Sequence, residues 1–465
     1  MKTNRRRFLT TLGATVSATL LGPSVFDFKL LAGSPFVRSD VGSMKATDPI
    51  LTGYSTAIAA MQALPLTDVR NWTYQAGIHY GSTSPMTDWN MCQHGTEFFW
   101  AWHRMYLYWW ERIVRKYSGN PNWALPYWNW TKQTKLPGPF RVVKSNLYTP
   151  NRDPNINNGT GSLPATDVAY TSPMSSDFSN LDYYSAQSAI EISPHNMVHG
   201  DVGGASGWMS YIDMAAQDPI FYLHHANIDR LWDLWLAQGG GRSDPTSDST
   251  WTSQSYQFYD EDGNTQSMTP CDILNAAAQL NYEYEGEPSQ VTQSCGTIPI
   301  WVFKYLVLLV VPFPPQPPIG PDPYTVQMSL ANILPQLEGI LSNSLQQVFL
   351  ELDGVQTAKP PGAGWEVYVG LPAGVAPEPS SPFYVGKMGL FSRGVRSGNR
   401  NFEPATFRFN ATNALKAVTA PGGDSAPISF FCKGIVVNGT QQPGQPQSDV
   451  TVKQARLVVQ TRSRQ

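Results

Sequence analysis

The chain has 465 residues, of which 41% are hydrophobic and only 14% charged, and its formal net charge is −3. This composition fits two or three well-buried domains and excludes a disordered chain. The basic residues are scattered along the sequence, so there is no electrostatic footprint for nucleic acid or for an anionic membrane surface.

The first residues have the pattern of an export signal. A basic start is followed by a weakly apolar stretch that ends at Gly22-Pro23, which is too short and too mild to span a bilayer. The run from Asn4 to Leu9 (NRRRFL) resembles the twin-arginine signal of bacteria, whose pathway carries folded proteins. We therefore expect residues 1–35 to be a twin-arginine-type signal and the protein to be periplasmic or secreted, with no stable membrane anchor.

Histidines first appear in two helical segments. His79 lies near the end of an aromatic-rich segment, where a histidine on its own is more often a hydrogen-bonded core residue than a ligand. His94 and His103 are nine residues apart, a spacing that on one continuous helix points them to opposite sides. They converge only if His94 precedes the helix, so we expect a break at Gly95-Thr96 and a helix over about residues 97–117.

The stretch 193–235 contains four of the seven histidines. His195 and His199 have i,i+4 spacing, which places one above the other on a helix face. Ser193 is the expected N-cap of this helix, with Pro194 at its first position. Such a pair is suited to binding one metal ion, although the spacing alone is only a moderate signal.

A further helix is expected after Asp218-Pro219, and it contains His224 and His225 side by side. Adjacent residues lie 100° apart on a helix, so only one of the two faces a given ion. Asp229 follows one turn after His225 as a carboxylate that could support a ligand. Arg230 is its expected structural companion.

The second half of the chain contains no histidine after His225 and changes character. Of four cysteines, Cys271 and Cys295 are the easiest pair to join in a disulfide, with free thiols as the alternative. Residues 291–323 combine an apolar run with a proline-rich end, which predicts a linker whose apolar part is a buried strand or an interdomain packing segment. Residues 324–465 alternate β-favouring runs with turns, as in an all-β sandwich or barrel.

All seven histidines fall between His79 and His225, a clustering that independent core histidines would not produce. No carboxylate-rich helical pattern of a di-iron site accompanies them, so a histidine-only site favours copper or zinc. Two three-histidine sites that face each other across a helical core would leave open positions for a shared small ligand. We therefore expect a mainly α region with a four-helix-bundle core that holds two metal ions.

At this point residues 70–290 resemble the type-3 copper family, which comprises tyrosinases, catechol oxidases and haemocyanins. The segment DPIFYLHHANID is similar to the second copper motif of that family, which implies that His225 is a ligand and His224 its neighbour. The resemblance implies two copper ions, with His79, His94 and His103 as ligands of the first and His195, His199 and His225 as ligands of the second.

Further positions are similar to functional residues of this family. Cys92, in the run Cys-Gln-His, resembles a cysteine that in fungal members is linked through sulfur to the ligand imidazole, here His94; a free buried cysteine is the alternative. Glu191 and Asn196 resemble a pair that orients a water able to deprotonate phenols, although Glu191 is also explained as an ordinary helix-terminal acid. Ile212 aligns with the gate position over the copper pair.

The domain order also follows from the resemblance. It implies a dicopper catalytic domain over residues 45–290, which ends at the motif Tyr282-Glu283-Tyr284. Residues 291–323 would then be a linker, and residues 324–465 look like the shielding domain of plant polyphenol oxidases. Such a domain keeps the enzyme latent until the linker is cut. The sequence does not identify the residue that would plug the site.

We therefore expect an oxidase that converts o-diphenols to o-quinones, with dioxygen and phenolic small molecules as its partners. Hydroxylation of monophenols is a further hypothesis, motivated by Glu191 and Asn196. A haemocyanin-like dioxygen carrier, an o-aminophenol oxidase and, more remotely, a hydrolytic dizinc enzyme are the alternatives. The oligomeric state is left open.

Overall fold

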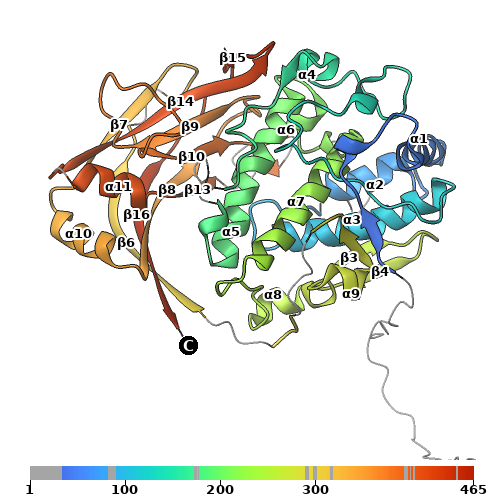
Figure 1. Ribbon diagram of the computed structural model, residues 1–465, viewed down its shortest axis with the longest axis horizontal. Coiled ribbons are helices and arrows are strands. Elements are labelled where there is room, and N and C mark those ends of the chain that lie inside the picture. Colours follow the sequence, from blue (N-terminus) through green and yellow to red (C-terminus); the bar gives the residue numbers. More distant parts are fainter. Residues whose placement is uncertain are drawn as a thin grey trace, which may run out of the picture. The chain divides into compact units, whose positions relative to one another are not determined.

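The computed structural model describes residues 34–81, 89, 91–171, 175, 177–287, 293–296, 301–314, 318–391, 396–397, 400–401, 404–420, 422–446 and 449–464. Nearly all of the expected export signal lies outside these residues. Within them, a mainly helical region up to residue 287 is followed by a β-rich region from residue 301 (Figure 1). This order agrees with the fold class predicted from the sequence.

The helical region is built around long buried helices joined by loops and short strands. Its helices are α1 (Pro49–Gln62), α2 (Trp72–His79), α3 (Phe99–Tyr117), α4 (Pro154–Asn158), α5 (Tyr183–Ile190), α6 (Asn196–Gly203), α7 (Ile220–Ala237), α8 (Ser249–Ser253) and α9 (Ala276–Leu280). Its strands are β1 (Phe36–Arg38), β2 (Gly161–Ser162), β3 (Tyr256–Tyr259), β4 (Thr265–Met268) and β5 (Tyr282–Tyr284).

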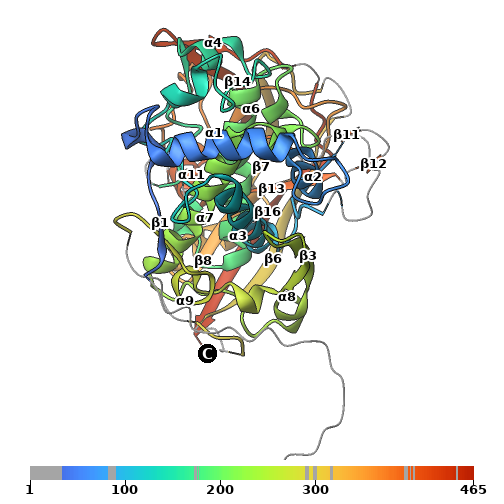
Figure 2. The same ribbon diagram turned by 90° about the vertical axis from the view of Figure 1, so that its right-hand side faces the viewer.

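Helix α3 is the central helix of this region, and it is buried on almost every side. Helix α1 packs across it (Figure 2), with the ring of Tyr54 edge-on to that of Trp110 at 5.7 Å. The helix begins at Phe99, slightly later than predicted, and the Thr96 hydroxyl accepts a hydrogen bond from the Phe98 amide just before it. His94 therefore lies in the preceding loop, as the angular argument requires.

The passage from α5 to α6 differs from the sequence prediction. A π-helical turn, Glu191–His195, joins the two helices, and it contains a cis Ser193–Pro194 peptide. Ser193 is extended (φ −152°, ψ 127°), because proline disfavours the helical conformation in the residue before it, and it is not the N-cap of the helix that follows. Helix α6 begins at Asn196 instead, with His195 in the cap position.

Two antiparallel sheets make up most of the β-rich region. One is four-stranded in the order β13-β8-β16-β6, and the other contains β10-β9-β14-β15, with β7 and β2 also paired to β14. Its elements are β6 (Trp301–Pro312), β7 (Tyr324–Ser329), α10 (Leu334–Ser342), β8 (Gln346–Val355), β9 (Gly364–Val369), β10 (Tyr384–Gly389), β11 (Arg396–Ser397), β12 (Arg400–Asn401), β13 (Ala405–Asn410), α11 (Thr412–Thr419), β14 (Ser425–Val437), β15 (Thr440–Pro443) and β16 (Gln454–Arg464).

One boundary and one fold assignment in this region need correction. The apolar run expected within a linker over residues 291–323 forms strand β6 and pairs along its whole length with β16. The strand lies at the edge of its sheet, and Leu306, Val307 and Val310 are exposed, so the expected burial is wrong. The β-branched and leucine side chains of β6 suit a pleated sheet, so the β-rich region starts well before residue 324. The region is also not purely β, because α10 and α11 pack against each other and against β8.

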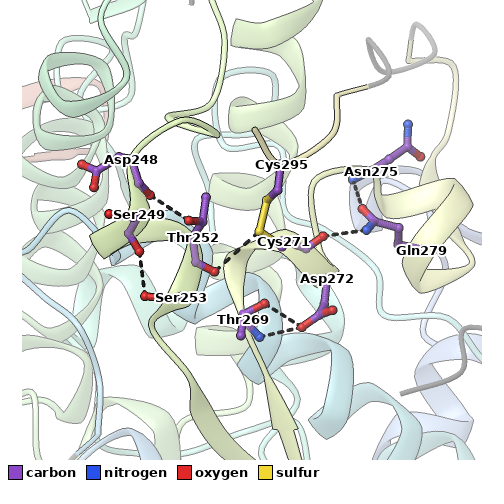
Figure 3. Close-up of a disulfide and its surroundings, with 10 residues drawn as sticks. All are labelled: Asp248, Ser249, Thr252, Ser253, Thr269, Cys271, Asp272, Asn275, Gln279 and Cys295. Carbon is purple, nitrogen blue, oxygen red and sulfur yellow. Dashed lines mark hydrogen bonds between the residues drawn. A yellow bond between two sulfur atoms is a disulfide. The ribbon is translucent and has the colours of Figure 1, made fainter. Parts of the chain in front are cut away.

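The predicted disulfide between Cys271 and Cys295 is present (Figure 3). It ties the segment after β4 to the chain that leads toward β6. Around it, the side-chain amide of Gln279 donates to the Cys271 carbonyl, and Asp272 accepts from both the amide and the hydroxyl of Thr269. The pairing holds the end of the helical region in place. Among the described residues, no helix is long and apolar enough to cross a membrane.

The helical and β-rich regions each contribute a side chain to the hydrophobic core of the other. Phe391, which follows β10, belongs to the hydrophobic core of the helical region. In the other direction, Ile192 of the π-helical turn belongs to the core of the β-rich region. Strand β14 also pairs with β2 of the helical region, where Val436 lies opposite Ser162. The two regions are therefore docked through interlocking contacts.

Candidate metal centre

Five helical elements and one loop bring the six histidines expected as ligands to one place. His79 ends α2, His94 precedes α3, and His103 lies one turn inside α3. The others are His195 at the end of the π-helical turn, His199 in α6 and His225 in α7. Five of the six are at most 2% exposed, and only His94 is half-buried.

The six rings lie in one cluster, described here by the two groups of three that the resemblance implies. In the first group, the ring centroids of His79 and His94 are 5.1 Å apart, and those of His94 and His103 are 4.8 Å apart. In the second, His195 lies 4.6 Å from His199 and 4.9 Å from His225. The groups meet where His103 stacks on His225 at 4.4 Å.

The nitrogens of these rings are arranged for metal binding. The Nδ1 atoms of His103 and His199 lie 2.7 Å from the Phe99 carbonyl and 2.8 Å from the Met209 carbonyl, respectively. A carbonyl only accepts, so each Nδ1 carries the proton and each Nε2 has a free lone pair. The Nε2 atoms of His199 and His225 approach to 3.4 Å. The arrangement fits a metal ion bound by Nε2.

Several imidazole nitrogens are buried without a partner among the described residues. They are both ring nitrogens of His79 and His94, Nε2 of His103, His195 and His224, and Nδ1 of His225. Leaving that many polar atoms unpaired is costly unless something else binds them. Each imidazole offers one nitrogen to an ion, so a pair of metal ions would satisfy one unpaired nitrogen on each of His79, His94, His103 and His195, and the residues fit the group that the sequence implied.

Burial keeps the imidazoles neutral. It lowers the pKa of His79 and of His195 to about 3, and it lowers the pKa of the other five histidines well below the usual value. Like-charge repulsion among the rings adds to this effect at His79 and His94. Because an imidazole binds a metal only when it is neutral, the site is prepared for metal at neutral pH.

His224 lies in the same cluster, and its ring could by position alone join His195, His199 and His225 around an ion. Its hydrogen bonding argues otherwise. The Trp130 indole, which only donates, points Nε1 at Nδ1 of His224 at 3.2 Å. A neutral His224 therefore carries its proton on Nε2 and has no lone pair there. This favours His225 over His224 as the ligand, as the sequence motif implied.

The remaining predicted residues lie around the histidines, and they make contacts of their own besides the roles expected of them. Glu191 is fully buried, and its Oε1 accepts from the Gly95 amide at 2.6 Å, which ties it to the His94 loop. Asn196 places Oδ1 at 2.9 Å from Nδ1 of His195 and donates through Nδ2 to the Gly389 carbonyl at 2.9 Å. Each residue therefore fixes a part of the metal centre.

Cys92 and Ile212 lie beside the first group of histidines. The Cys92 sulfur and one nitrogen each of His79 and His94 all lie within 4.8 Å of one another. Ile212 is 3% exposed. Its backbone lies beside the His79 ring and raises the pKa of His79, while the stronger effect of burial lowers it. The gate role that the resemblance implied for Ile212 stays a prediction.

Behind the second group, buried charges anchor helix α7. Asp229, one turn after His225, accepts from the hydroxyls of Tyr282 and Tyr284 at 2.6 Å each and forms ion pairs with Arg38 and Arg104. Both arginines lower the pKa of its carboxyl against the opposing effect of burial, which is the largest. The prediction that Arg230 is the companion of Asp229 is therefore wrong, because the ion-pair partners of Asp229 are Arg38 and Arg104.

Phe391 is the residue near the centre that sequence reasoning missed. Its ring stacks on His199 at 3.7 Å with an interplanar angle of 13°. It also stands edge-on to His94 at 5.6 Å and to His195 at 5.7 Å. A side chain from the β-rich region thus covers rings of both histidine groups.

Comparisons with known proteins agree with this site. Residues 69–176 and 141–238 match the common central domain of tyrosinase, and residues 245–294 match the polyphenol oxidase middle domain. The tyrosinase HcTyr1 of Hahella sp. (strain CCB-MM4) is 32% identical over 299 residues, which cover 53% of this chain and 62% of its own. The latent form of a polyphenol oxidase from Prunus armeniaca is 31% identical over 290 residues, 54% of this chain and 48% of its own. The chain therefore spans less than two thirds of the length of either relative.

Solved structures share the fold over nearly the whole chain. A latent aurone synthase (polyphenol oxidase) covers 95% of this chain and 92% of its own, with a TM-score of 0.65 and 22% identity. A deoxygenated hemocyanin from Rapana thomasiana covers 90% of this chain and 99% of its own, with a TM-score of 0.51 and 16% identity. At these identities the likeness concerns the fold alone.

The fold and the site together define a histidine-only dinuclear metal centre in a helical core, followed by a β-rich region. Over residues 69–294, the helical region matches the central and middle domains of the tyrosinase and polyphenol oxidase family of type-3 copper proteins, and its histidine cluster fits that family.

Proposed function

We propose that the protein is a copper oxidase that converts o-diphenols to o-quinones with dioxygen. The observation that carries this proposal is the cluster of six neutral imidazoles, five of which have an unpaired ring nitrogen, in a chain whose helical region matches the central domain of tyrosinase. The test is to load the protein with copper and assay a monophenol, an o-diphenol and an o-aminophenol in parallel, before and after limited proteolysis. The proposal expects diphenol oxidation, and it fails if copper-loaded, proteolysed protein oxidises none of the three.

In this function the residues of the chain bind the copper ions and shield the ligands from water. We assign His79, His94 and His103 to one copper and His195, His199 and His225 to the other. When bound, the copper pair supplies the electron exchange between the diphenol and dioxygen. Phe221, whose ring lies 4.8 Å from His79 and 4.3 Å from His225, helps to exclude water from the ligands.

Glu191 and Asn196 are proposed to act on monophenols. In this hypothesis the Glu191 carboxylate takes up the phenolic proton through a water beside the Asn196 amide. We expect Glu191→Gln and Asn196→Gly to lower the ratio of monophenolase to diphenolase rate by about tenfold or more. Both rates are measured on proteolysed protein with its copper content determined, because Glu191 and Asn196 also hold the His94 loop and His195. Unchanged ratios of monophenolase to diphenolase rate at full copper content would contradict this hypothesis.

The β-rich region is proposed to keep the enzyme latent, with Phe391 as the plug. Its ring covers His199 in the position where a phenol ring would stack. Relatives with a similar fold are described as latent polyphenol oxidases. Because β6 belongs to the four-stranded sheet, only cleavage before Trp301 frees the whole β-rich region.

Two further features of the sequence give proposals of their own. A thioether between Cys92 and His94 is supported by the short distance between the sulfur and the imidazole nitrogens, and a tryptic peptide lighter by two hydrogens would reveal it. Export by the twin-arginine route is supported by residues 4–9, and replacing Arg5 and Arg6 by lysine should retain the protein in the cytoplasm.

The rival functions are separated by simple measurements. A haemocyanin-like carrier shares the fold, but it would bind dioxygen without oxidising catechol. An o-aminophenol oxidase would prefer the aminophenol in the parallel assay. A hydrolytic dizinc enzyme is excluded if metal analysis finds two copper ions per chain.

A further inference from the structure

A buried ion pair joins the two regions close to the plug. Lys387 on β10 is 2% exposed, and Asp167 of the helical region is fully buried. The Lys387 ammonium donates to Oδ1 of Asp167 and, at 3.2 Å, to the Thr166 hydroxyl. Among the ion pairs between the described residues, this is the one that links the two regions with both partners almost completely buried.

Two further carboxyls lie close to this pair. Asp201 of the helical region is 6% exposed, and Glu366 of β9 is 3% exposed. The charges of Asp167 and Asp201 interact, and those of Lys387 and Glu366 also interact. Burial is the largest cause that raises the pKa of both Asp201 and Glu366. Lys387 is the cation paired with Asp167, and without it Asp167 would be a buried carboxylate with no cation beside it at the interface, which is strongly unfavourable.

The same strand leads directly to the plug. Lys387 and Gly389 share one face of β10, because side chains alternate along a strand, and Phe391 follows two residues after the strand ends. Lys387 forms the ion pair, and Phe391 covers His199. Between them Gly389 lies so close to α6 that an added Cβ would be 2.6 Å from the Met197 sulfur. The end of β10 is thus held against the helical region at three successive positions.

We propose that the Lys387–Asp167 ion pair is the latch that holds Phe391 over the metal centre. Lys387 is a positioning residue and touches neither metal nor substrate. When the pair is broken, the end of β10 separates from the helical region more often and Phe391 leaves the histidines. The proposal rests on the proposed latent oxidase, but its structural part, the uncovering of the site, does not need catalysis to be observed.

The test uses the copper-loaded, full-length chain with Lys387→Met, which keeps the length of the side chain and removes its charge. Two quantities are measured without protease: the rate of diphenol oxidation and the rate at which a chelator removes copper. We expect both to rise by about tenfold or more, because the open state is more populated. After limited proteolysis the variant and the unmodified protein should have equal oxidation rates.

Asp167→Asn supplies a second variant, since it keeps the shape of the partner and is useful if Lys387→Met does not accumulate. Lys433→Met is the matched control, because Lys433 lies 3.7 Å from Glu366 on the same sheet but is 27% exposed. The control should stay latent. Unchanged rates in both test variants, at full copper content, would overturn the latch. Faster copper removal with no oxidation even after proteolysis would support the latch and contradict the oxidase.

Discussion

Replacing Phe391 by alanine in the full-length chain is expected to raise the rate of diphenol oxidation without protease by about tenfold or more. The phenyl ring lies 3.7 Å from His199 and edge-on to His94 and His195. It therefore fills the space in which a substrate ring would approach both groups of ligands. Removing it opens that space while the β-rich region stays attached.

The matched control for this prediction is Phe383→Ala. Phe383 is a partly buried residue that packs on the core of the β-rich region, away from the histidines. Its removal weakens that core without opening the metal centre, so the protein should remain latent. If Phe391→Ala were as inactive as the unmodified chain before proteolysis, and fully active after it, the plug would have to be another residue.

Replacing His225 by alanine is expected to reduce the copper content from two ions to about one per chain and the oxidation rate by about a thousandfold. Its Nε2 faces that of His199 at 3.4 Å, and its ring stacks on His103 between the two groups. The loss of this imidazole removes a ligand at the point where the groups meet. Metal analysis and the rate after proteolysis measure the two effects.

His224→Gln is the control, because His224 lies in the same cluster as His225 but is not assigned as a copper ligand. A glutamine carbonyl can still accept the hydrogen bond that the Trp130 indole donates to His224. The variant should keep two copper ions and most of the activity. Equal copper loss in the His224 and His225 variants would contradict the assignment.

Much of the metal centre could be predicted from the sequence, because local helix geometry and short sequence motifs identify its residues. The nine-residue spacing of His94 and His103 required a break before the helix, and the structure has His94 in a loop before α3. Only one of His224 and His225 could face an ion. The Trp130 hydrogen bond, which pairs residues far apart in the chain, supplies an independent reason for the choice.

The features that escaped prediction depend on tertiary contacts. Phe391 follows a strand and looks like a core residue of a sheet, and only the docking of β10 on α6 brings it to the histidines. Lys387 looks like an exposed strand residue until Asp167, 220 positions away in the chain, is placed beside it. The run 301–312 has the composition of either a strand or an interdomain segment, and pairing with β16 decides between them.

Dioxygen consumption with catechol by the copper-loaded chain, after cleavage before Trp301, tests the central claim most directly. The account predicts that protein with two copper ions per chain consumes dioxygen while o-quinone accumulates, and that uncleaved protein does so far more slowly. A chain that contains two copper ions but binds dioxygen reversibly and leaves catechol unoxidised, even after cleavage, would contradict it.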